Sequence, residues 1–325
     1  MKAVVYSAYG GPDVLQIADV ETPTPDPNEI LVKVHGAALN PYDWHFVRGK
    51  PFPMRMMTGG LSRPKPRRRI GGDFSGTIAA AGAAVTGFAI GDPVFGTGEG
   101  SVAEYVTVAA DTVVRKPERI TFEQAAGVGV AGLTALQILR DKAAVQPEHR
   151  VLIVGAAGGI GTFAVQIARA LGAHVTGVQS TSALDLVRSL GADRVIDYTT
   201  DDFTTGDARY DVVLDNVCNR TLSDVRRVVP PGGAIIPNGG GSPEKGISLV
   251  GLLRTLAMRP FIPQRVLFGV TKPNRADLQV LADMIQAGTV TPVVDRCYPL
   301  AATADAMRHL EAGHAHGKVV ITVQA

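Results

Sequence analysis

Short apolar runs alternate with helical patterns through the middle of the chain. Residues 151–154, Val-Leu-Ile-Val, are apolar throughout, which predicts a strand buried on both faces. Residues 162–171 carry apolar side chains at helical spacing and are followed by Gly172, so a helix is expected there. The same region predicts further strands at 175–178, 194–197, 211–215, 234–236 and 266–268, and a second helix at 184–190. Strands joined by such crossovers form a doubly wound parallel α/β sheet of the Rossmann type.

The first part of the chain, residues 1–117, has a different pattern. Short strands separated by glycines and prolines are predicted at 3–6, 15–17, 30–35, 76–81, 93–96 and 103–108. Their spacing indicates a partly open β-barrel in a separate domain. Near residue 121 the composition changes, and Thr121 and Gln124 fit a capping box that opens a small, apolar helical stretch running to residue 139.

The tail predicts helices at 276–287 and 301–310 and strands at 291–298 and 318–323. Two strands do not fold alone, so we expect the tail to pack back onto the first domain. The expected domains are therefore 1–120 together with 271–325, and 121–270.

A turn of small residues links the strand 151–154 to the following helix, in the pattern Ala156-x-Gly158-x-x-Gly161. The helix dipole and the unpaired N–H groups of this turn suit a pyrophosphate, and side chains at Gly158 or Gly159 would block its oxygens. A side chain at Gly161 would push the helix off the strand. Such turns also occur without ligands, but the surrounding sheet favours a dinucleotide site, with Ala157, Gly158, Gly159 and Ile160 as its candidate contacts.

The end of the second predicted strand indicates which dinucleotide binds. The strand runs into Gln179-Ser180-Thr181-Ser182, where NAD sites usually carry an acidic residue. Hydroxyl groups without a carboxylate favour NADPH, with Ser180 and Tyr198 as candidate contacts to its 2′-phosphate. The alternative is that Ser180 and Ser182 cap the next helix. A clear Lys or Arg partner is missing, because Arg188 is expected two turns along that helix.

Composition limits the class of protein. The chain has 325 residues, 46% hydrophobic and 19% charged, with a net charge of +2. It can form a full core, and its charge gives no general support for binding nucleic acid or membranes. The two cysteines, Cys218 and Cys297, are too far apart to suggest a disulfide framework or zinc cluster. The one basic run, 63–69, is interrupted by prolines and is expected to be a solvated loop, although it could guide a phosphorylated ligand. No apolar run reaches bilayer length and no signal core opens the chain, so a cytoplasmic protein is expected.

Several motifs in order along the chain carry a family resemblance. They are Asn40-Pro41-Tyr42-Asp43, Gly71-Gly72-Asp73-Phe74-Ser75-Gly76, Ala131-Gly132-Leu133-Thr134-Ala135, the glycine turn, Leu190-Gly191-Ala192-Asp193 and His316-Gly317-Lys318-Val319-Val320. Together they resemble the medium-chain dehydrogenase/reductase family, in particular its zinc-free quinone oxidoreductases. The resemblance implies a GroES-like barrel as the catalytic domain, a nucleotide domain and a homodimer.

The zinc-dependent branch of that family holds its catalytic metal at positions that correspond here to Asn40, Gly72 with Asp73, and Gly127. Of these residues only Asp73 is a zinc ligand by type, and one carboxylate does not make a site. We therefore expect no metal.

Without a metal, NADPH would transfer hydride to a quinone or an α,β-unsaturated carbonyl, and a hydrogen-bond donor would stabilise the charge that develops on oxygen. The resemblance implies that the loop 40–45 lies at the nicotinamide end, with Asn40 among the cofactor contacts and Tyr42 or His45 as proton donor. Relatives often have Tyr where this chain has His45. The alternatives are that His45 only packs the loop, and that water supplies the proton.

Other candidate cofactor contacts also follow from the resemblance. Thr134 is expected to bind the carboxamide, or else to bond its own helix. Gly239 and Gly240 follow the fifth strand at the ligand-binding edge of the sheet, where a flexible turn is the alternative. His316 and Lys318 correspond to contacts on the phosphate side of the cofactor. The alternative for Lys318 is a lysine exposed to solvent. Asp73 is expected to support its loop through backbone bonds.

Two other functions remain open at this point: a zinc-independent NADP(H)-dependent alcohol dehydrogenase or carbonyl reductase, and a non-catalytic NADPH-binding protein.

Overall fold

The computed structural model describes residues 1–239, 241–242, 249–269 and 271–323 and contains two compact units. Unit 1 comprises Met1–Leu133, Lys272–Gly288 and Pro292–Ala325. Unit 2 comprises Thr134–Thr271 and Thr289–Thr291. The chain therefore leaves unit 1, builds unit 2, and returns.

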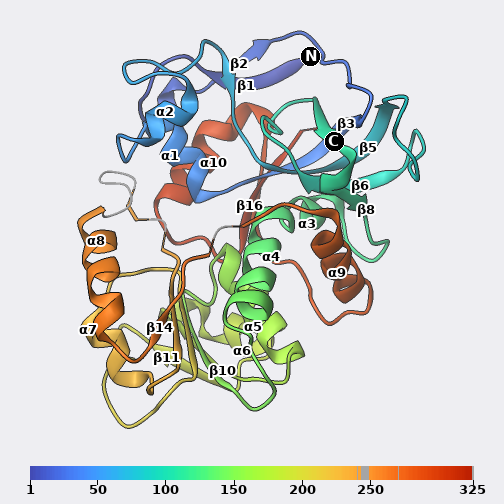
Figure 1. Ribbon diagram of the computed structural model, residues 1–325. Coiled ribbons are helices and arrows are strands. Elements are labelled where there is room, and N and C mark those ends of the chain that lie inside the picture. Colours follow the sequence, from blue (N-terminus) through green and yellow to red (C-terminus); the bar gives the residue numbers. More distant parts are fainter. Residues whose placement is uncertain (240, 243–248, 270, 324–325) are drawn as a thin grey trace. The chain divides into compact units, whose positions relative to one another are not determined.

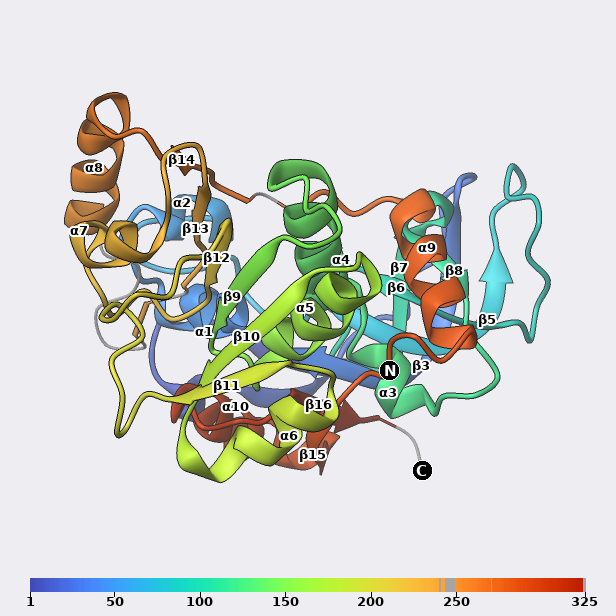
Figure 2. The ribbon, with the colours of Figure 1, turned by 90° about the horizontal axis from the view of Figure 1, so that it is seen from below.

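Unit 2 is built on a parallel sheet with the order β11-β10-β9-β12-β13-β14 in its described part. These strands are β9 (Arg150–Val154), β10 (His174–Gln179), β11 (Arg194–Asp197), β12 (Val212–Asp215), β13 (Ala234–Pro237) and β14 (Arg265–Val266). The helices are α5 (Gly159–Ala170), α6 (Leu184–Ser189), α7 (Leu222–Val225) and α8 (Leu249–Met258). Figure 2 shows β9, β10 and β11 side by side. The predicted doubly wound sheet is confirmed, and its strand order reverses between β9 and β12, where such sheets bind ligands.

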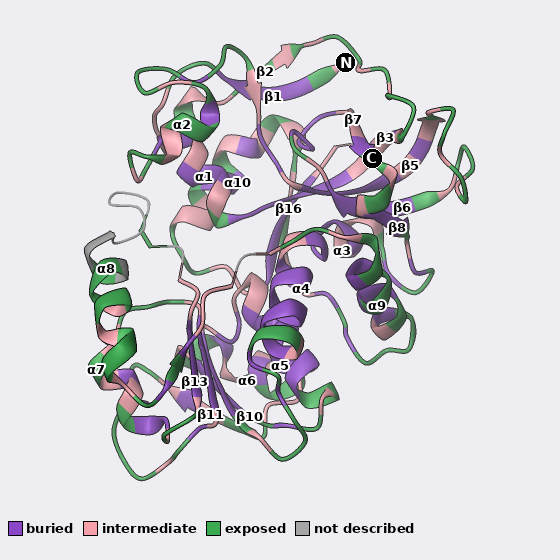
Figure 3. Cartoon of the chain, in the orientation of Figure 1, coloured by how far each residue is buried: buried purple, intermediate pink, exposed green. Residues whose placement is uncertain are grey.

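The buried strands of unit 2 explain the sequence pattern. Residues 151–154 of β9 are buried, and Figure 3 shows the same for much of the neighbouring sheet. Because helices cover both faces of a doubly wound sheet, the strand is apolar at consecutive positions and does not alternate. Helix α5 buries Phe163, Val165 and Ile167.

Unit 1 contains a sheet with the order β15-β16-β3-β5-β6-β8, in which β7 also pairs with β3, and a smaller sheet with the order β2-β1-β4. The strands are β1 (Lys2–Tyr6), β2 (Gln16–Asp19), β3 (Glu29–Leu39), β4 (Arg68–Arg69), β5 (Asp73–Ala81), β6 (Pro93–Thr97), β7 (Tyr105–Ala109), β8 (Val113–Arg115), β15 (Val294–Pro299) and β16 (Lys318–Thr322). This is the GroES-like partly open barrel that the sequence predicts. The short strand β4 pairs part of the basic run with β1, whereas Arg63, Lys65 and Arg67 are exposed.

The tail segments Lys272–Gly288 and Pro292–Ala325 belong to unit 1. Strand β16 pairs antiparallel with β3, with Val319 opposite Leu39. Helices α9 (Arg275–Gln286) and α10 (Thr303–Glu311) belong to the same unit, and Arg48 forms two hydrogen bonds, of 2.5 and 2.8 Å, with the carboxylate of Glu311.

The helical stretch predicted from Ala125 to Leu139 is interrupted. Helix α3 (Phe122–Ala126) ends, and α4 (Gly129–Leu136) begins separately and continues into a π-helical turn at Gln137–Lys142. Unit 1 also contains the helices α1 (Pro41–Arg48) and α2 (Met54–Thr58). The capping box at Thr121 and Gln124 is confirmed by hydrogen bonds of 3.0 and 3.2 Å. The break frees the N–H of Val130, which donates to Asp73 Oδ1 at 2.7 Å. A side chain at Gly129 would begin only 2.4 Å from that oxygen, so the approach requires glycine.

Within the described residues, no helix is both long and apolar enough to span a bilayer.

Candidate functional site

The glycine turn of unit 2 leaves a helix N-terminus without a side-chain cap. Helix α5 begins at Gly159, earlier than predicted, and its N-cap residue Gly158 has an extended backbone. The N–H groups of the first helical turn have no partner within the helix, and the dipole adds positive potential there. This donor set fits a pyrophosphate.

Three glycines of the turn, Gly155, Gly158 and Gly161, have different surroundings. Gly155 has a φ of +73°, in the left-handed region that favours glycine. A Cβ at Gly161 would lie 2.1 Å from the carbonyl oxygen of Gly155, as expected for a position where helix and strand are in contact. A Cβ at Gly158 would meet only that same oxygen, at 3.3 Å, so the protein itself nearly has room for a side chain there.

Neighbouring strands hold the turn in place through contacts that sequence patterns did not reveal. The N–H of Ala157 donates to Gln179 Oε1 at 3.4 Å. Asn216, just after β12, donates through Nδ2 to the carbonyl of Val154 at 3.2 Å. Parallel pairing brings these strand ends to the same edge of the sheet.

The predicted 2′-phosphate region contains Ser180 and Tyr198. Ser180 forms a 3.3 Å side-chain contact with Ser182 and makes no side-chain cap bond to the helical turn after it, so the capping alternative is not observed. Tyr198 is 47% exposed, and its N–H donates to the carbonyl of Gln179 at 3.2 Å. Arg188 donates to Asp185 at 2.6 Å.

Asp197 corrects the expectation that this region has no carboxylate. It is paired with Gln179 across β10 and β11, and it accepts a hydrogen bond from Thr181. Hydrogen bonds from Thr181 and Thr199 lower the pKa of Asp197, so the group is ionised. Asp197 lies on the parallel neighbour β11, so the residues at the end of β10 alone do not reveal it.

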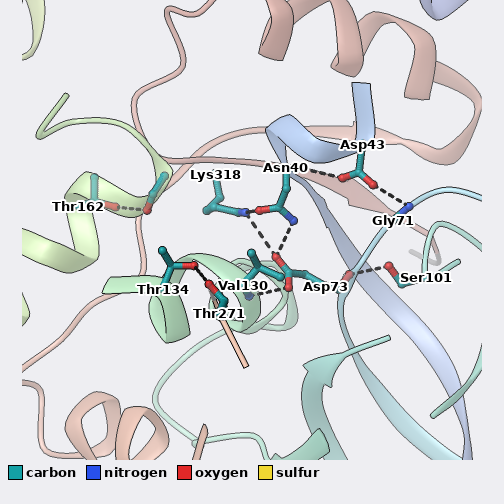
Figure 4. A network of polar contacts seen from close by, with 11 residues as sticks. Asn40, Asp43, Gly71, Asp73, Ser101, Val130, Thr134, Thr162, Thr271 and Lys318 are labelled. Atoms are coloured by element: carbon teal, nitrogen blue, oxygen red, sulfur yellow. Dashed lines mark hydrogen bonds and ion pairs between the residues drawn. The ribbon is translucent and has the colours of Figure 1, made fainter. Parts of the chain in front are cut away.

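Two further candidates lie in unit 2. The N–H of Gly239 donates to Cys218 Sγ at 3.2 Å, and a Cβ at Gly239 would lie 2.7 Å from the carbonyl oxygen of Val217, so close approach of the two loops requires glycine. Gly240 lies outside the described residues. The hydroxyl of Thr134 lies 2.5 Å from that of Thr271, a partner that the sequence did not indicate (Figure 4).

Unit 1 contains a buried polar network formed by Asn40, Asp73 and Lys318. Lys318 Nζ donates to Asn40 Oδ1 at 2.5 Å and lies 3.4 Å from Asp73 Oδ2. Asn40 Nδ2 donates to the same Asp73 oxygen at 2.9 Å. In Figure 4 the three side chains point toward one another. Asn40 and Lys318 are 3% exposed and Asp73 is fully buried, so these groups are satisfied mainly by one another.

The register of the barrel explains why these residues meet. Asn40 follows the last residue of β3, Asp73 opens β5, and Lys318 opens β16. Both β5 and β16 run antiparallel to β3, so their first residues lie beside its end. Burial raises the pKa of the Asp73 carboxyl, and the Lys318 charge and the Asn40 bond oppose that shift.

A second buried carboxylate, Asp43, ties helix α1 to the same region. It accepts hydrogen bonds from the N–H groups of Asn40, at 2.8 Å, and Gly71, at 3.1 Å. Burial raises the pKa of Asp43 to about 7 against these bonds. Asp43 therefore fixes the backbone that carries Asn40.

The two predicted proton donors have different surroundings. The Tyr42 hydroxyl lies where a side chain of Gly72 would start, since a Cβ there would be 1.5 Å from Oη. Burial, with smaller contributions from Asp43 and Asp73, raises the pKa of Tyr42 well above its ordinary value, so its hydroxyl stays neutral. His45 is buried, donates through Nδ1 to the carbonyl of Lys50 at 2.7 Å, and packs its ring 3.7 Å from that of Trp44.

The tail motif is divided between two environments. His316 donates its backbone N–H to Asp295 Oδ1 at 3.1 Å, whereas Lys318 turns into the buried network. The solvated alternative for Lys318 is therefore wrong. Asp73 accepts a backbone N–H bond from Val130 in α4, not from its own loop, and also binds two side chains that the sequence did not connect to it.

The residues at the positions of the family's catalytic zinc do not fit a metal ion. The Lys318 ammonium lies against Asn40 and Asp73, and its stem fills the space beside Gly127, where a Cβ would be 3.1 Å from Lys318 Cγ. A cation would have to displace another cation. Among the described residues no group of three His, Cys, Asp or Glu side chains gathers that could hold a metal.

Comparisons with known proteins cover almost the whole chain. A family model described as alcohol dehydrogenase GroES-like domain matches residues 26–118, and one described as zinc-binding dehydrogenase matches residues 190–321. The chain is 34% identical to a chloroplastic NADPH-dependent alkenal/one oxidoreductase of Arabidopsis thaliana, over 99% of this chain and 79% of the relative. It is 32% identical to a mitochondrial NAD(P)H oxidoreductase of Mus musculus, over 99% of this chain and 89% of that protein. The solved quinone oxidoreductase of Coxiella burnetii is 29% identical, with a TM-score of 0.86 over 100% of this chain and 99% of that one.

Proposed function

We propose that this chain, which belongs to the medium-chain dehydrogenase/reductase family and to its quinone oxidoreductase-like branch, transfers hydride from NADPH to a quinone or an α,β-unsaturated carbonyl. The observation that carries the proposal is the uncapped start of α5, next to the point where the strand order of unit 2 reverses. Gly159 and Ile160 would donate their backbone N–H groups to the pyrophosphate there, and Ala157 and Gly158, whose N–H groups bond Gln179 Oε1 and the carbonyl of Gly155, would line it.

We infer NADPH in preference to NADH from the end of β10. Ser180 offers a hydroxyl and Tyr198 an exposed ring at this edge, and the strand brings no carboxylate of its own. Asp197 keeps its charge, and its carboxylate is engaged by hydrogen bonds from Thr181 and Thr199. The name of the Arabidopsis relative, an NADPH-dependent enzyme, supports this choice.

When bound, NADPH supplies the hydride. Tyr42 would then donate a hydrogen bond to the oxygen on which charge develops, because the raised pKa of its hydroxyl keeps the group neutral. His45 is the weaker candidate, since its Nδ1 proton is committed to Lys50 and its ring packs on Trp44. For a quinone, hydride transfer gives the quinol monoanion, and one proton from solvent then gives the quinol.

We propose that the reaction needs no zinc, because the Lys318 ammonium lies where the metal would be held. We keep Thr134, Gly239, Gly240 and His316 as candidate cofactor contacts on the family resemblance alone. The same resemblance supports a homodimer. A cytoplasmic location is our proposal from the sequence, and the names of the plant and mouse relatives place those proteins in plastids and mitochondria.

The test is an acceptor panel followed by the loss of NADPH absorbance. Quinones and enones should be reduced faster than simple ketones and aldehydes, and activity should persist after prolonged treatment with a chelator. Preferred turnover of simple ketones would favour a carbonyl reductase. Tight NADPH binding without oxidation by any acceptor would favour a non-catalytic binding protein, and loss of activity on chelation would refute the metal-free reaction.

A further inference from the structure

The basic run 63–69 belongs to a longer segment whose charge is entirely positive. Residues 44–72 contain eight of the 32 Lys and Arg residues of the chain and none of its 30 Asp and Glu residues. The net charge of +2 therefore averages a strongly basic segment with a net acidic remainder. Arg48 and Arg68 are paired with carboxylates from other segments. The exposed cations of the segment include Arg63, Lys65 and Arg67.

The same segment presents apolar side chains to solvent around helix α2. Four of them are at least half exposed, namely Phe52, Met56, Met57 and Leu61. Figure 3 shows exposed residues along α2 in green. Single exposed apolar side chains are ordinary, but four of them within ten residues form a patch of the kind that marks an interaction surface.

The fold places two of the cations beside this patch. The turn that carries Arg63 and Lys65 is folded back onto α2, since the N–H of Lys65 donates to the carbonyl of Thr58 at 3.0 Å. The stem of Lys65 packs against the end of the helix, where a Cβ at Gly59 would lie 2.4 Å from Lys65 Cγ. Cations and apolar side chains together form the α2 surface, which consists of Phe52, Met56, Met57, Leu61, Arg63 and Lys65.

Tyr9 and Arg55 hold the inner side of this loop. The Tyr9 hydroxyl donates to the carbonyl of Gly60 at 2.7 Å, and Arg55 Nη1 donates to the carbonyl of Leu61 at 2.9 Å. The Arg55 guanidinium lies over the rings of Tyr9 and Phe52, 4.6 and 5.2 Å from their centres. These backbone carbonyls are satisfied from inside the protein, so they lose no hydrogen bonds when the outer side chains leave water.

This combination fits a lipid surface better than it fits other partners. Two copies that met through the same surface would bring cations against cations. A single-stranded nucleic acid stacks its bases on aromatic side chains and would gain little from two exposed methionines. Anionic headgroups attract Lys and Arg, and the layer just below them takes up Phe, Leu and Met side chains.

We propose that the α2 surface docks this protein on a bilayer that contains anionic phospholipids. The cations of the surface contact the headgroups, and its apolar side chains enter the interfacial layer just below them. Such binding is peripheral, in keeping with the finding that none of the described helices is long and apolar enough to cross a bilayer. The proposal goes beyond hydride transfer and does not depend on it.

The first test is co-sedimentation of the full chain with large vesicles. Phosphatidylcholine vesicles that contain about 30% phosphatidylglycerol should bind the protein at least about tenfold more tightly than vesicles of phosphatidylcholine alone. Salt should weaken this binding, because it screens the attraction between the cations and the headgroups. Equal binding to the two kinds of vesicle, or binding to neither, would overturn the proposal.

Two variants test the two kinds of side chain separately. Arg63→Gln/Lys65→Gln should weaken binding to the anionic vesicles about tenfold, because two headgroup contacts are lost. Met56→Ser should weaken it about fivefold, because an apolar side chain no longer leaves water. The urea midpoint of both variants should match that of the wild type, since all three residues are exposed.

Matched controls remove the same kinds of side chain elsewhere. Ile90 is 74% exposed, as Met56 is, so Ile90→Ser is the control for Met56→Ser. Arg194→Gln/Arg209→Gln removes two exposed arginines outside the basic segment. Both controls should bind the anionic vesicles within about twofold of the wild type. Losses as large in the controls as in the variants would overturn the assignment to the α2 surface.

Fluorescence reports whether the surface enters the lipid. The single native tryptophan, Trp44, is 4% exposed, so its emission should not change when vesicles are added. In Phe52→Trp, the additional emission should shift to the blue with the anionic vesicles and be quenched by brominated acyl chains. Emission that stays unchanged while the protein sediments with the vesicles would overturn the proposed insertion.

Competition distinguishes lipid from other polyanions. If single-stranded RNA or polyglutamate binds through Arg63 and Lys65 and the anionic vesicles do not, the surface serves that other class of partner and the proposal is wrong. All these measurements use the protein without NADPH. A failure to reduce any acceptor would therefore contradict the proposed function and leave the result with the vesicles unaffected.

Discussion

Alanine substitutions at Gly161 and Gly158 distinguish a packing role from a ligand-binding role within the glycine turn. A Cβ at Gly161 would lie 2.1 Å from the carbonyl oxygen of Gly155 and 2.7 Å from the backbone of Ala156. Ordinary contact begins at about 3.4 Å, so in Gly161→Ala helix α5 and the turn must separate by roughly 1.3 Å (3.4 − 2.1). Backbone atoms form the obstacle, and rotation of a side chain cannot relieve it.

The expected magnitude follows from two opposing effects. Overpacking of this kind costs about 3 kcal/mol at the upper end of the usual range. Alanine in place of glycine inside a helix stabilises the helix by about 1 kcal/mol. Gly161→Ala should therefore destabilise unit 2 by about 2 kcal/mol, which corresponds to about 4–8 °C in Tm for a unit of this size. Gly158→Ala meets one oxygen at 3.3 Å and should change stability by less than about 0.5 kcal/mol.

Urea unfolding and NADPH titration together test the pair. Gly161→Ala should lower the unfolding midpoint, whereas Gly158→Ala should keep the midpoint and weaken NADPH about tenfold or more, because its methyl group occupies the phosphate side. Equal stability of Gly161→Ala and wild type would refute the packing argument. Unchanged NADPH affinity in Gly158→Ala would refute the role of the turn in phosphate binding.

Three further predictions concern other parts of the site. Ser180→Asp should weaken NADPH more than NADH, measured by titration, because a carboxylate would repel the 2′-phosphate; equal weakening would contradict the assignment. The pKa of Asp43 is about 7 in the folded protein, against 3.8 in the unfolded chain. Between these two pH values the folded state binds more protons than the unfolded state. The free energy of unfolding should therefore fall as pH rises from 3.8 to 7, by on the order of 4 kcal/mol. Asp43→Asn should reduce this change of the free energy of unfolding with pH, measured by urea unfolding at several pH values. An unaltered pH dependence would mean that other groups cause it. Gly72→Ala should displace the Tyr42 hydroxyl and lower kcat about as much as Tyr42→Phe, whereas a fully active Gly72→Ala protein would show that this position of the hydroxyl is dispensable.

The fold could be predicted from the sequence largely because its signals are local. The apolar run of β9, the glycines of the turn and the strand–helix alternation each occupy consecutive residues, so their periodicity defines the sheet of unit 2. The packing of the tail onto the first domain could be expected because two strands alone do not form a stable sheet. The interruption at Gly129 was missed because its cause, Asp73, is far away in the sequence.

The candidate site was predictable only where a single segment forms it. The buried network joins residues 40, 73, 130 and 318, and no spacing rule connects them. A lysine near a chain end is normally solvated, so the inward direction of Lys318 depends on the register of β16 against β3. Asp197 was likewise invisible, because its position beside Gln179 depends on which strand neighbours β10.

The strand that carries Lys318 has a consequence for the order in which the protein is made. The segments of unit 2 end at Thr291, whereas the ammonium group reaches Asn40 only after β16 has been synthesised and has paired with β3. A nascent chain can therefore form the glycine turn while the partner of Asn40 and Asp73 is still absent. Synthesis would thus complete the buried network of unit 1 last.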